Sequence, residues 1–211
     1  MNPEKHSAFF RLIEALRSDG CPICRICEDL DKKYVDDFFY ESVNDPGLRA
    51  RLERSLGFGE LGARLAQAQA DGLGMSIILA DLCRALIGRL GAGDLALKRA
   101  ADCVVMEHHF QTEKTYLAVF ASHCQDEEVW QAHAAGLGFC LHHLRLCLPG
   151  LPEPGRERLL QAEQEHLKRL ESRMRALVDR SRADSTATPT PAEHAAWREA
   201  LRKFFQPDGR R

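Results

Sequence analysis

The sequence has little net charge and no long hydrophobic run. Lysine and arginine together number 29 and aspartate and glutamate 31, so the formal net charge is −2 at pH 7. Without a basic excess to neutralise phosphates, we expect neither nucleic acid nor an anionic membrane as a partner. The most apolar stretch, residues 72–82, contains Asp81 and is too short to span a bilayer. Residues 1–18 mix charged with apolar side chains and lack a signal-peptide core, so we expect a cytoplasmic protein.

The sequence also lacks the motifs of common enzyme classes. No Ser-His-Asp arrangement, pair of catalytic carboxylates or nucleotide fingerprint can be placed in it. Gly72 and Gly74 have no following lysine and no preceding strand, so they do not form a phosphate loop. His108, His109 and Glu113 lack the Glu-x-x-His spacing of di-metal helix sites and are predicted to form a solvated polar face. We therefore expect binding rather than catalysis.

Strand patterns are missing as well, whereas helical spacing of apolar residues recurs along the chain. Phe9, Ile13 and Leu16, for example, share one helix face. The predicted fold class is all-α, a helical bundle. The expected helices cover about residues 21–43, 48–55, 60–70, 72–90, 95–122, 155–182 and 192–205.

A polar segment near the C-terminus separates the predicted body from a last helix. Residues 183–191 are rich in Ser, Thr and Pro and are predicted to form a linker. Residues 1–182 are predicted to form the helical body, and residues 192–211 to contain a helix that docks back on it.

Apolar residues recur every seven positions in the helix expected over residues 155–182. Leu160, Leu167 and Met174 form one such series, and Leu170 and Leu177 form another. This spacing leaves a dimeric coiled coil open, but the seam is short and Glu163 interrupts it, which favours packing onto the protein's own bundle. The sequence therefore predicts a monomer or a homodimer, and it leaves room for an unknown protein partner.

Two stretches, about residues 21–90 and 103–150, share a pattern of spaced residues. Each contains a cysteine, a tyrosine 13 and a phenylalanine 17 positions later, an acidic turn and a Gly-Phe pair, with one residue lost from the second stretch. The matched positions are Cys21 and Cys103, Tyr34 and Tyr116, Phe38 and Phe120, Asp45 and Asp126, Gly57-Phe58 and Gly138-Phe139, and Leu65 and Leu146. We interpret the fold as two degenerate, pseudo-twofold-related helical units plus C-terminal helices.

The eight cysteines point to the chemistry of the chain. In a reducing compartment a disulfide framework is not expected, so metal binding or thiol chemistry gains weight. Cys83, Cys124 and Cys147 belong to no motif and are predicted to be core or incidental residues.

Two short motifs have metal-ligand spacing. Cys21 and Cys24 lie three positions apart at a predicted helix start, where backbone N–H groups and the helix dipole favour thiolates. Cys140 and His143 have the same spacing at another predicted helix start. Because three thiolates and one imidazole make a good tetrahedral zinc set, these four residues are the predicted ligands of one zinc site, structural rather than catalytic.

The degenerate repeat indicates that the two units share this site. Where the first unit would have Cys-x-x-His, residues 59–62 read Gly-Glu-Leu-Gly, and where the second would have Cys-Pro-x-Cys, residues 103–106 read Cys-Val-Val-Met. If each unit built its own site, neither site would have the four ligands of a tetrahedron. If instead each site takes its Cys-Pro-x-Cys motif from one unit and its Cys-x-x-His motif from the other, the two pairs of ligands that remain complete one site. Only Cys103 is then left of the second site. Cys21 and Cys140 are therefore expected to lie close together.

The same motifs resemble those of an uncharacterised bacterial family, a domain of unknown function with Cys-Pro-x-Cys near its N-terminus and Gly-Phe/Leu-Cys-x-x-His further on. The matching residues are Cys21-Pro22-Ile23-Cys24, residues 40–46 (Tyr-Glu-Ser-Val-Asn-Asp-Pro) and Gly138-Phe139-Cys140-Leu141-His142-His143. The resemblance covers most of the chain, and it implies a residue pattern without implying an activity.

Two other interpretations of the cysteines remain open. Cys21, Cys24 and Cys27 resemble a ferredoxin-type run, in which Cys140 would be the fourth ligand of a 4Fe–4S cluster. Against this, Cys27 is predicted to lie inside a helix, and the last ferredoxin-type cysteine with its proline is missing. Cys-Pro-Ile-Cys at a helix start is also typical of a thiol-redox pair, although the βαβ context is absent. The alternative function is therefore an iron–sulfur or thiol-redox accessory protein.

Overall fold

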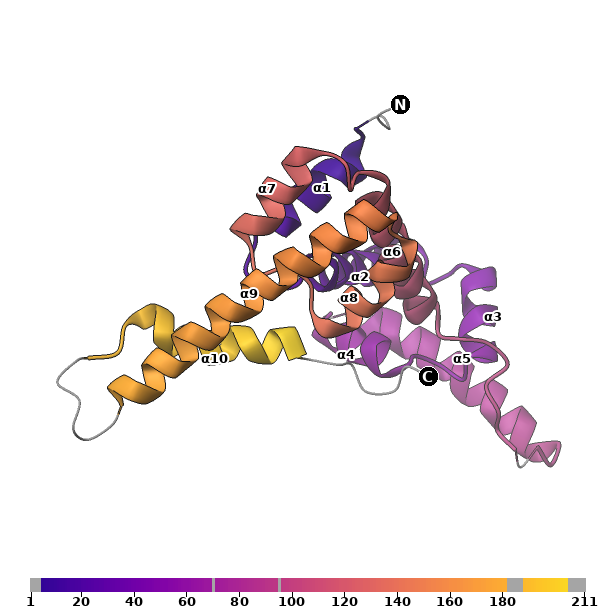
Figure 1. Ribbon diagram of the computed structural model, residues 1–211. Coiled ribbons are helices and arrows are strands. Elements are labelled where there is room, and N and C mark those ends of the chain that lie inside the picture. Colours follow the sequence, from indigo (N-terminus) through magenta and orange to yellow (C-terminus); the bar gives the residue numbers. More distant parts are fainter. Residues whose placement is uncertain (1–4, 70, 95, 182–187, 205–211) are drawn as a thin grey trace. The chain divides into compact units, whose positions relative to one another are not determined.

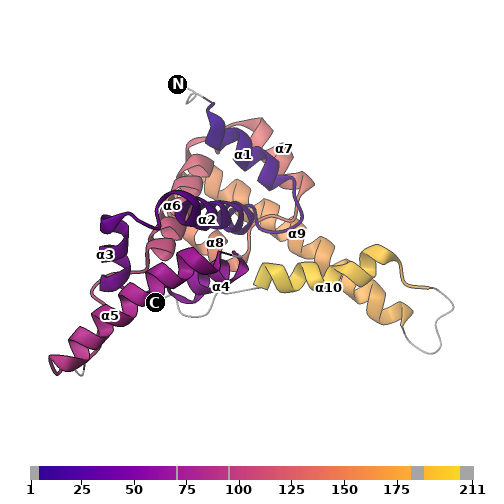
Figure 2. The same cartoon turned by 180° about the vertical axis from the view of Figure 1, so that it is seen from behind.

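The computed structural model describes residues 5–69, 71–94, 96–181 and 188–204. These residues form helices, turns and irregular connections without any strand, so the predicted all-α class is confirmed for the described part of the chain (Figures 1 and 2). None of the helices in these ranges is both long and apolar enough to cross a membrane. The elements are α1 (Ser7–Leu16), α2 (Pro22–Glu41), α3 (Pro46–Arg54), α4 (Glu60–Ala68), α5 (Gly72–Gly91), α6 (Val104–Ser122), α7 (Glu127–Ala135), α8 (Leu141–Cys147), the 3₁₀ turn η1 (Leu148–Gly150), α9 (Glu153–Arg180) and α10 (Pro191–Phe204).

Polar caps and prolines fix several helix starts. Asp45 accepts a hydrogen bond from the backbone N–H of Leu48 at 2.6 Å, and Pro46 takes the first position of α3. Asp71 accepts from the N–H of Gly74 at 2.9 Å at the start of α5. A carboxylate that accepts from an N–H of the first turn satisfies a donor that has no partner inside the helix.

The long helix predicted from residue 95 begins nine residues later, at Val104. Upstream, the Asp94 carboxylate accepts from the N–H groups of Ala96 and Leu97 at 3.2 and 3.4 Å. Leu97 has a φ of 42°, a left-handed conformation that a helix cannot include. Residues 96–103 are therefore irregular rather than helical, and the sequence-based boundary was wrong.

The contacts divide the chain into two compact units. Unit 1 comprises Met1–Ile26 and Lys114–Arg211, and unit 2 comprises Cys27–Glu113. Consequently the first turn of α2 belongs to unit 1 while the rest of that helix belongs to unit 2. In α6 the order is reversed, and the part that begins at Val104 belongs to unit 2.

Unit 1 contains pairs of packed helices. Helix α7 packs against α1 and α9, and α10 packs along α9 in both views (Figures 1 and 2). Leu160 and Leu167 of the expected seven-residue seam are 41% and 38% exposed. The face of α9 that is buried consists of Gly155, Leu159, Glu163, His166 and Leu170. The series that contains Leu160 and Leu167 thus lies outside the buried face, whereas Leu170 of the second series and Glu163 lie within it.

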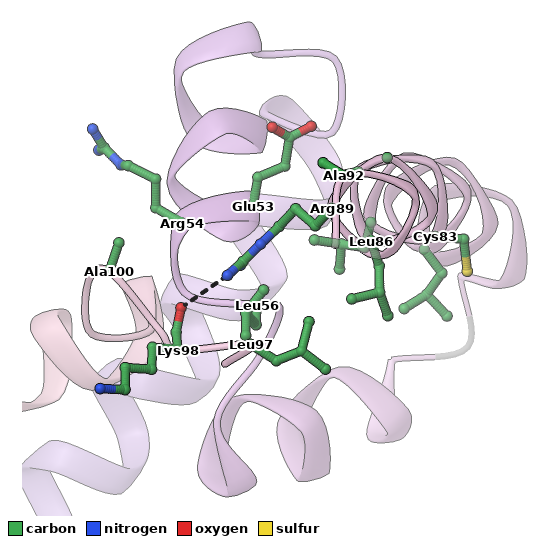
Figure 3. Close-up of a pocket in the computed structure, with 14 residues that line it drawn as sticks. Glu53, Arg54, Leu56, Cys83, Leu86, Arg89, Ala92, Leu97, Lys98 and Ala100 are labelled. Atoms are coloured by element: carbon green, nitrogen blue, oxygen red, sulfur yellow. Dashed lines mark hydrogen bonds between the residues drawn. The ribbon is translucent and has the colours of Figure 1, made fainter. Parts of the chain in front are cut away.

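Unit 2 has its own apolar core, and one side of α5 remains outside it. The core contains Val35, Phe38, Leu52 and Ile78. A groove of about 840 Å³ lies between α5, the end of α3 and the segment after α5. Arg89 donates to the backbone oxygen of Lys98 there at 3.4 Å, and Figure 3 shows this hydrogen bond among the lining side chains. Cys83 lines this groove and is exposed, so it is an incidental surface cysteine rather than a core residue.

Candidate metal centre

The four predicted ligand residues come together in unit 1. The ring nitrogen Nδ1 of His143 lies 3.4, 3.3 and 3.1 Å from the sulfur atoms of Cys21, Cys24 and Cys140, respectively. The sulfurs of Cys24 and Cys140 are 3.7 Å apart. All four candidate ligand atoms lie within 4.8 Å of one another.

These separations match the edges of a zinc tetrahedron. Bonds of about 2.3 Å to sulfur and about 2.0 Å to nitrogen place two sulfurs about 3.8 Å apart and a sulfur and a nitrogen about 3.5 Å apart. The Cys24–Cys140 separation is 3.7 Å, and the sulfur–nitrogen separations run from 3.1 to 3.4 Å. A divalent ion at the centre would therefore require only small shifts of the side chains.

Two helix starts present the ligands. Cys21 precedes Pro22, and its carbonyl accepts from the N–H of Arg25 at 3.1 Å, so Cys24 lies one turn into α2. Cys140 is the N-cap residue of α8, and its carbonyl accepts from the N–H of Leu144 at 2.9 Å. The spacing of three within each motif brings both side chains of a motif to one end of its helix. The positive ends of the helix dipoles favour the thiolates that a metal requires.

Burial and hydrogen bonding favour a closed site with a localised negative charge. Cys21, Cys140 and His143 are 7%, 1% and 3% exposed, and Cys24 is half-buried. Hydrogen bonds from Cys21 and Cys24 lower the pKa of the Cys140 thiol, although burial raises it. The hydrogen bond with Cys140 and that with Cys21 raise the pKa of Cys24.

The other cysteines do not join this cluster. Cys124 and Cys147 are 4% and 2% exposed, as expected of core residues. Burial raises the pKa of Cys147 to about 12, which suppresses its thiolate. Cys27 lies in the second turn of α2, and the Cys₃His cluster found among the described residues does not include it. None of the eight cysteines forms a disulfide bond.

One relative places the chain in a family. The chain is 30% identical over 142 residues to the uncharacterized 23.9 kDa protein in the xynA 3′ region of Caldicellulosiruptor sp. (strain Rt8B.4); the alignment covers 65% of this chain and 70% of that protein. The chain belongs to the family of that protein. No protein-family model matches it, and no solved structure matches it. Its function must therefore be argued from its own residues.

Sequence reasoning overlooked the polar group that contacts the loop before Cys140. Glu163 is 2% exposed, and its Oε1 accepts a hydrogen bond from the backbone N–H of Phe139 at 2.7 Å. The available signal was the spacing of small, apolar and polar residues on one face of α9: Gly155, Leu159, Glu163, His166 and Leu170. A carboxylate in such a series is expected to be buried and partnered rather than to interrupt a seam.

The prediction of a solvated polar face at His108 and His109 was wrong. Asp31 of α2 is 1% exposed, and its two oxygens accept from Nδ1 of His108 at 2.9 Å and of His109 at 2.5 Å. Tyr34 stacks on His108 with ring centroids 4.3 Å apart, and Glu113 is 8% exposed. Burial raises the pKa of Asp31, but the hydrogen bonds from the two imidazoles outweigh it and lower the pKa overall. This buried polar group joins α2 to α6 within unit 2.

The positions of the degenerate motifs also lie together, in unit 2. A Cβ atom added to Gly59 would lie 3.6 Å from Cβ of Cys103 and 3.6 Å from Cγ of Met106. A Cβ atom added to Gly62 would lie 3.1 Å from a methyl group of Val105. The Gly-x-x-Gly motif of the first repeat stretch therefore faces the Cys-x-x-Met motif of the second.

Similar aromatic pairs occur in the two stretches that share a pattern of spaced residues in the sequence. Phe38 and Phe58 pack edge to face with centroids 5.8 Å apart in unit 2, and Phe120 and Phe139 do so at 4.9 Å in unit 1. The glycines that precede Phe58 and Phe139 have φ values of 93° and 73°, a region that glycine enters without strain. The same local geometry thus precedes the Gly-x-x-Gly and the Cys-x-x-His motifs.

Proposed function

We propose that this chain is a zinc-binding protein whose single metal ion is held by Cys21, Cys24, Cys140 and His143. The observation that carries the proposal is the convergence of the His143 Nδ1 atom with three sulfurs at tetrahedral separations. Three thiolates and an imidazole suit zinc, a borderline-soft ion without redox chemistry.

The proposed role of the metal is structural. Structural zinc sites are bound by four protein ligands, whereas catalytic sites keep one position for water or substrate. The cluster offers four ligand atoms from residues that are mostly buried, and the number of ligands leaves no position for a substrate. When bound, the ion would hold the start of α2 against the start of α8, and the protein would act by binding rather than catalysis.

The proposal extends to the internal repeat. The exchange of halves between repeat stretches is supported by the division of α2 and α6 between the two units. Residues 22–26 of α2 belong to unit 1 and residues 27–41 to unit 2, whereas residues 104–113 of α6 belong to unit 2 and residues 114–122 to unit 1. It is further supported by the approach of Gly59 to Cys103 and Met106. On this account unit 1 retains a complete site and unit 2 has lost three of the four ligands of a second one.

Metal analysis of the purified full-length protein tests the proposed function. Elemental analysis should find one equivalent of zinc, and Cys140→Ser and His143→Ala should each remove it. Cys147→Ser is the matched control, because Cys147 is equally buried in unit 1 and lies outside the cluster. Iron with labile sulfide, lost on Cys27→Ser, would instead support the cluster-bearing alternative. A protein that binds no metal and shows a rapidly alkylated Cys21 would support the thiol-redox alternative.

A further inference from the structure

The loop between α7 and α8 leads to Cys140, and its backbone conformation is closely constrained by neighbouring residues. A Cβ atom on Gly136 would lie 2.0 Å from the backbone oxygen of Leu16, so the backbone approaches the end of α1 more closely than any side chain would permit. Gly138 has a φ of 73°, and a Cβ atom there would lie 2.4 Å from Oε1 of Glu163. The loop is thus pressed between α1 and α9.

Two buried side chains hold this loop by its backbone. Oε1 of Glu163 accepts from the N–H of Phe139 at 2.7 Å, one residue before Cys140. The Lys203 ammonium donates to the carbonyl of Leu137 at 2.9 Å and also to the other oxygen of Glu163. Glu163 comes from α9 and Lys203 from α10, so the pair of C-terminal helices in unit 1 contacts both ends of the segment that precedes the ligand.

A chain of hydrogen bonds fixes the orientation of Glu163. The guanidinium of Arg169 can only donate, so Nδ1 of His166, 2.5 Å away, accepts. Burial lowers the pKa of His166 to about 4, so the ring is neutral and its Nε2–H donates to Nδ1 of His133 at 3.3 Å. Nε2 of His133 must then carry the hydrogen that it donates to Oε1 of Glu163 at 3.0 Å. Glu163 is held from the His133 side as well as by Lys203.

Packing alone does not account for these buried charges. Glu163 and Lys203 are 2% and 7% exposed, and the pKa of Glu163 is lowered by His133 and Lys203 in spite of the burial that raises it. A buried ion pair commonly contributes no more stability than apolar side chains of the same volume. Apolar side chains, however, could neither accept a hydrogen bond from the N–H of Phe139 nor donate one to the carbonyl of Leu137.

We propose that Glu163 and Lys203 are positioning residues of the metal centre, which fix the Leu137–Phe139 backbone so that the Cys140 sulfur stands at the metal-binding distance from Cys24 and His143. This inference rests on the proposed zinc site. Groups that orient metal ligands without touching the metal commonly account for a 10- to 100-fold difference in affinity. The C-terminal helices α9 and α10 therefore help to position a ligand of the site, although neither supplies one.

Zinc competition titrations on full-length variants test the positioning role. Glu163→Leu should raise the zinc dissociation constant by about 10- to 100-fold, and it should alter the visible spectrum of the cobalt-substituted protein. The double variant Glu163→Gln with Lys203→Met keeps an oxygen near the Phe139 N–H without leaving a buried charge, so it should bind zinc more tightly than Glu163→Leu. It should still bind less tightly than the wild type, because the Leu137 carbonyl loses its donor. Lys203→Met alone should weaken binding less than Glu163→Leu, and it provides a second variant if the Glu163→Leu chain fails to fold.

Leu159→Ala is the control for a general loss of stability. Leu159 lies one turn before Glu163 on α9 and is fully buried, so its truncation should lower the melting temperature while zinc affinity and the cobalt spectrum stay unchanged. Tight zinc binding that survives both Glu163→Leu and Lys203→Met would contradict the positioning role alone. A wild-type chain that binds no metal would contradict the proposed function itself.

Discussion

The sulfur atoms of Cys24 and Cys140 lie 3.7 Å apart although 116 positions separate the residues in the sequence. A metal bound there would bind the folded state and not the unfolded chain, in which these residues are far apart. Its binding would therefore shift the equilibrium toward the folded protein. The metal is therefore expected to contribute to the stability of unit 1 as well as to its local geometry.

Removal of the metal should destabilise the protein. A ligand at a free concentration about 1,000 times its dissociation constant stabilises the folded state by about 4 kcal/mol. For a chain of this length each kcal/mol corresponds to about 2–4 °C, so chelation should lower the melting temperature by about 8–16 °C. Differential scanning calorimetry with and without a chelator measures the shift, and added zinc should reverse it. An unchanged melting temperature after verified loss of metal would show that the ion is not structural.

Alkylation should distinguish the cysteines by exposure and by metal protection. In the zinc-bound protein, iodoacetamide should modify Cys83 first, because it is exposed at the groove beside α5. Cys21, Cys24 and Cys140 should react only after chelation, since a metal-bound thiolate is a poor nucleophile. Peptide mass spectrometry reads out each site. Cys147, which is buried and lies outside the cluster, should stay unmodified in both states. Rapid modification of Cys24 in the metal-loaded protein would contradict its role as a metal ligand.

Asp31, which accepts hydrogen bonds from His108 and His109, should make the stability of unit 2 depend on pH in the acid range. The folded-state pKa of Asp31 lies below its ordinary value of 3.8, so its contribution is complete above that value and is lost as the pH falls through the lower folded-state pKa. Asp31→Asn should lower the unfolding free energy at pH 7 by about 1–3 kcal/mol, the cost of a buried hydrogen-bond partner lost. Urea titrations from pH 7 to pH 2 should show the difference between wild type and variant shrinking below about pH 4. A difference that stays constant with pH would show that Asp31 does not act through its charge.

The degenerate motifs should accept a second metal when their ligands are restored. Gly59→Cys, Gly62→His and Met106→Cys, together with the native Cys103, would recreate a Cys₃His set where Gly59 already faces Cys103 and Met106. The methyl group of Val105 must move by a few tenths of an ångström, because it lies 3.1 Å from a Cβ at residue 62. Elemental analysis of this triple variant should give two equivalents of zinc. The control carries Gly59→Ser, Gly62→Ala and Met106→Ser, and it should keep one. A folded triple variant with a single zinc would argue against exchanged repeats.

Much of this organisation was predictable from sequence because it depends on local patterns. Helical spacing predicted the all-α class, and the two motifs with spacing of three predicted the four residues that meet in unit 1. The helix expected from residue 21 agrees with α2, which begins at Pro22, whereas α3 begins at Pro46, two residues before the expected start at residue 48. These features involve residues within a few positions of one another, where spacing determines which side chains share a face.

The remainder depends on contacts between residues distant in sequence. Glu163 was interpreted as an interruption of a seam, because nothing in α9 shows that its partners are Lys203 and the backbone of Phe139. His108 and His109 were interpreted as exposed for the same reason, since Asp31 lies 77 and 78 positions away. A charged residue in a sequence is exposed by default, and only its tertiary partners make burial tolerable.

X-ray absorption at the zinc edge of the purified protein would measure the ligand set itself. Three sulfur atoms at about 2.3 Å and one nitrogen at about 2.0 Å are the expected first coordination shell. In Cys140→Ser any zinc that remains should show two sulfur neighbours instead of three. A shell of four sulfurs, or one made mainly of oxygen, would contradict a site formed by Cys21, Cys24, Cys140 and His143.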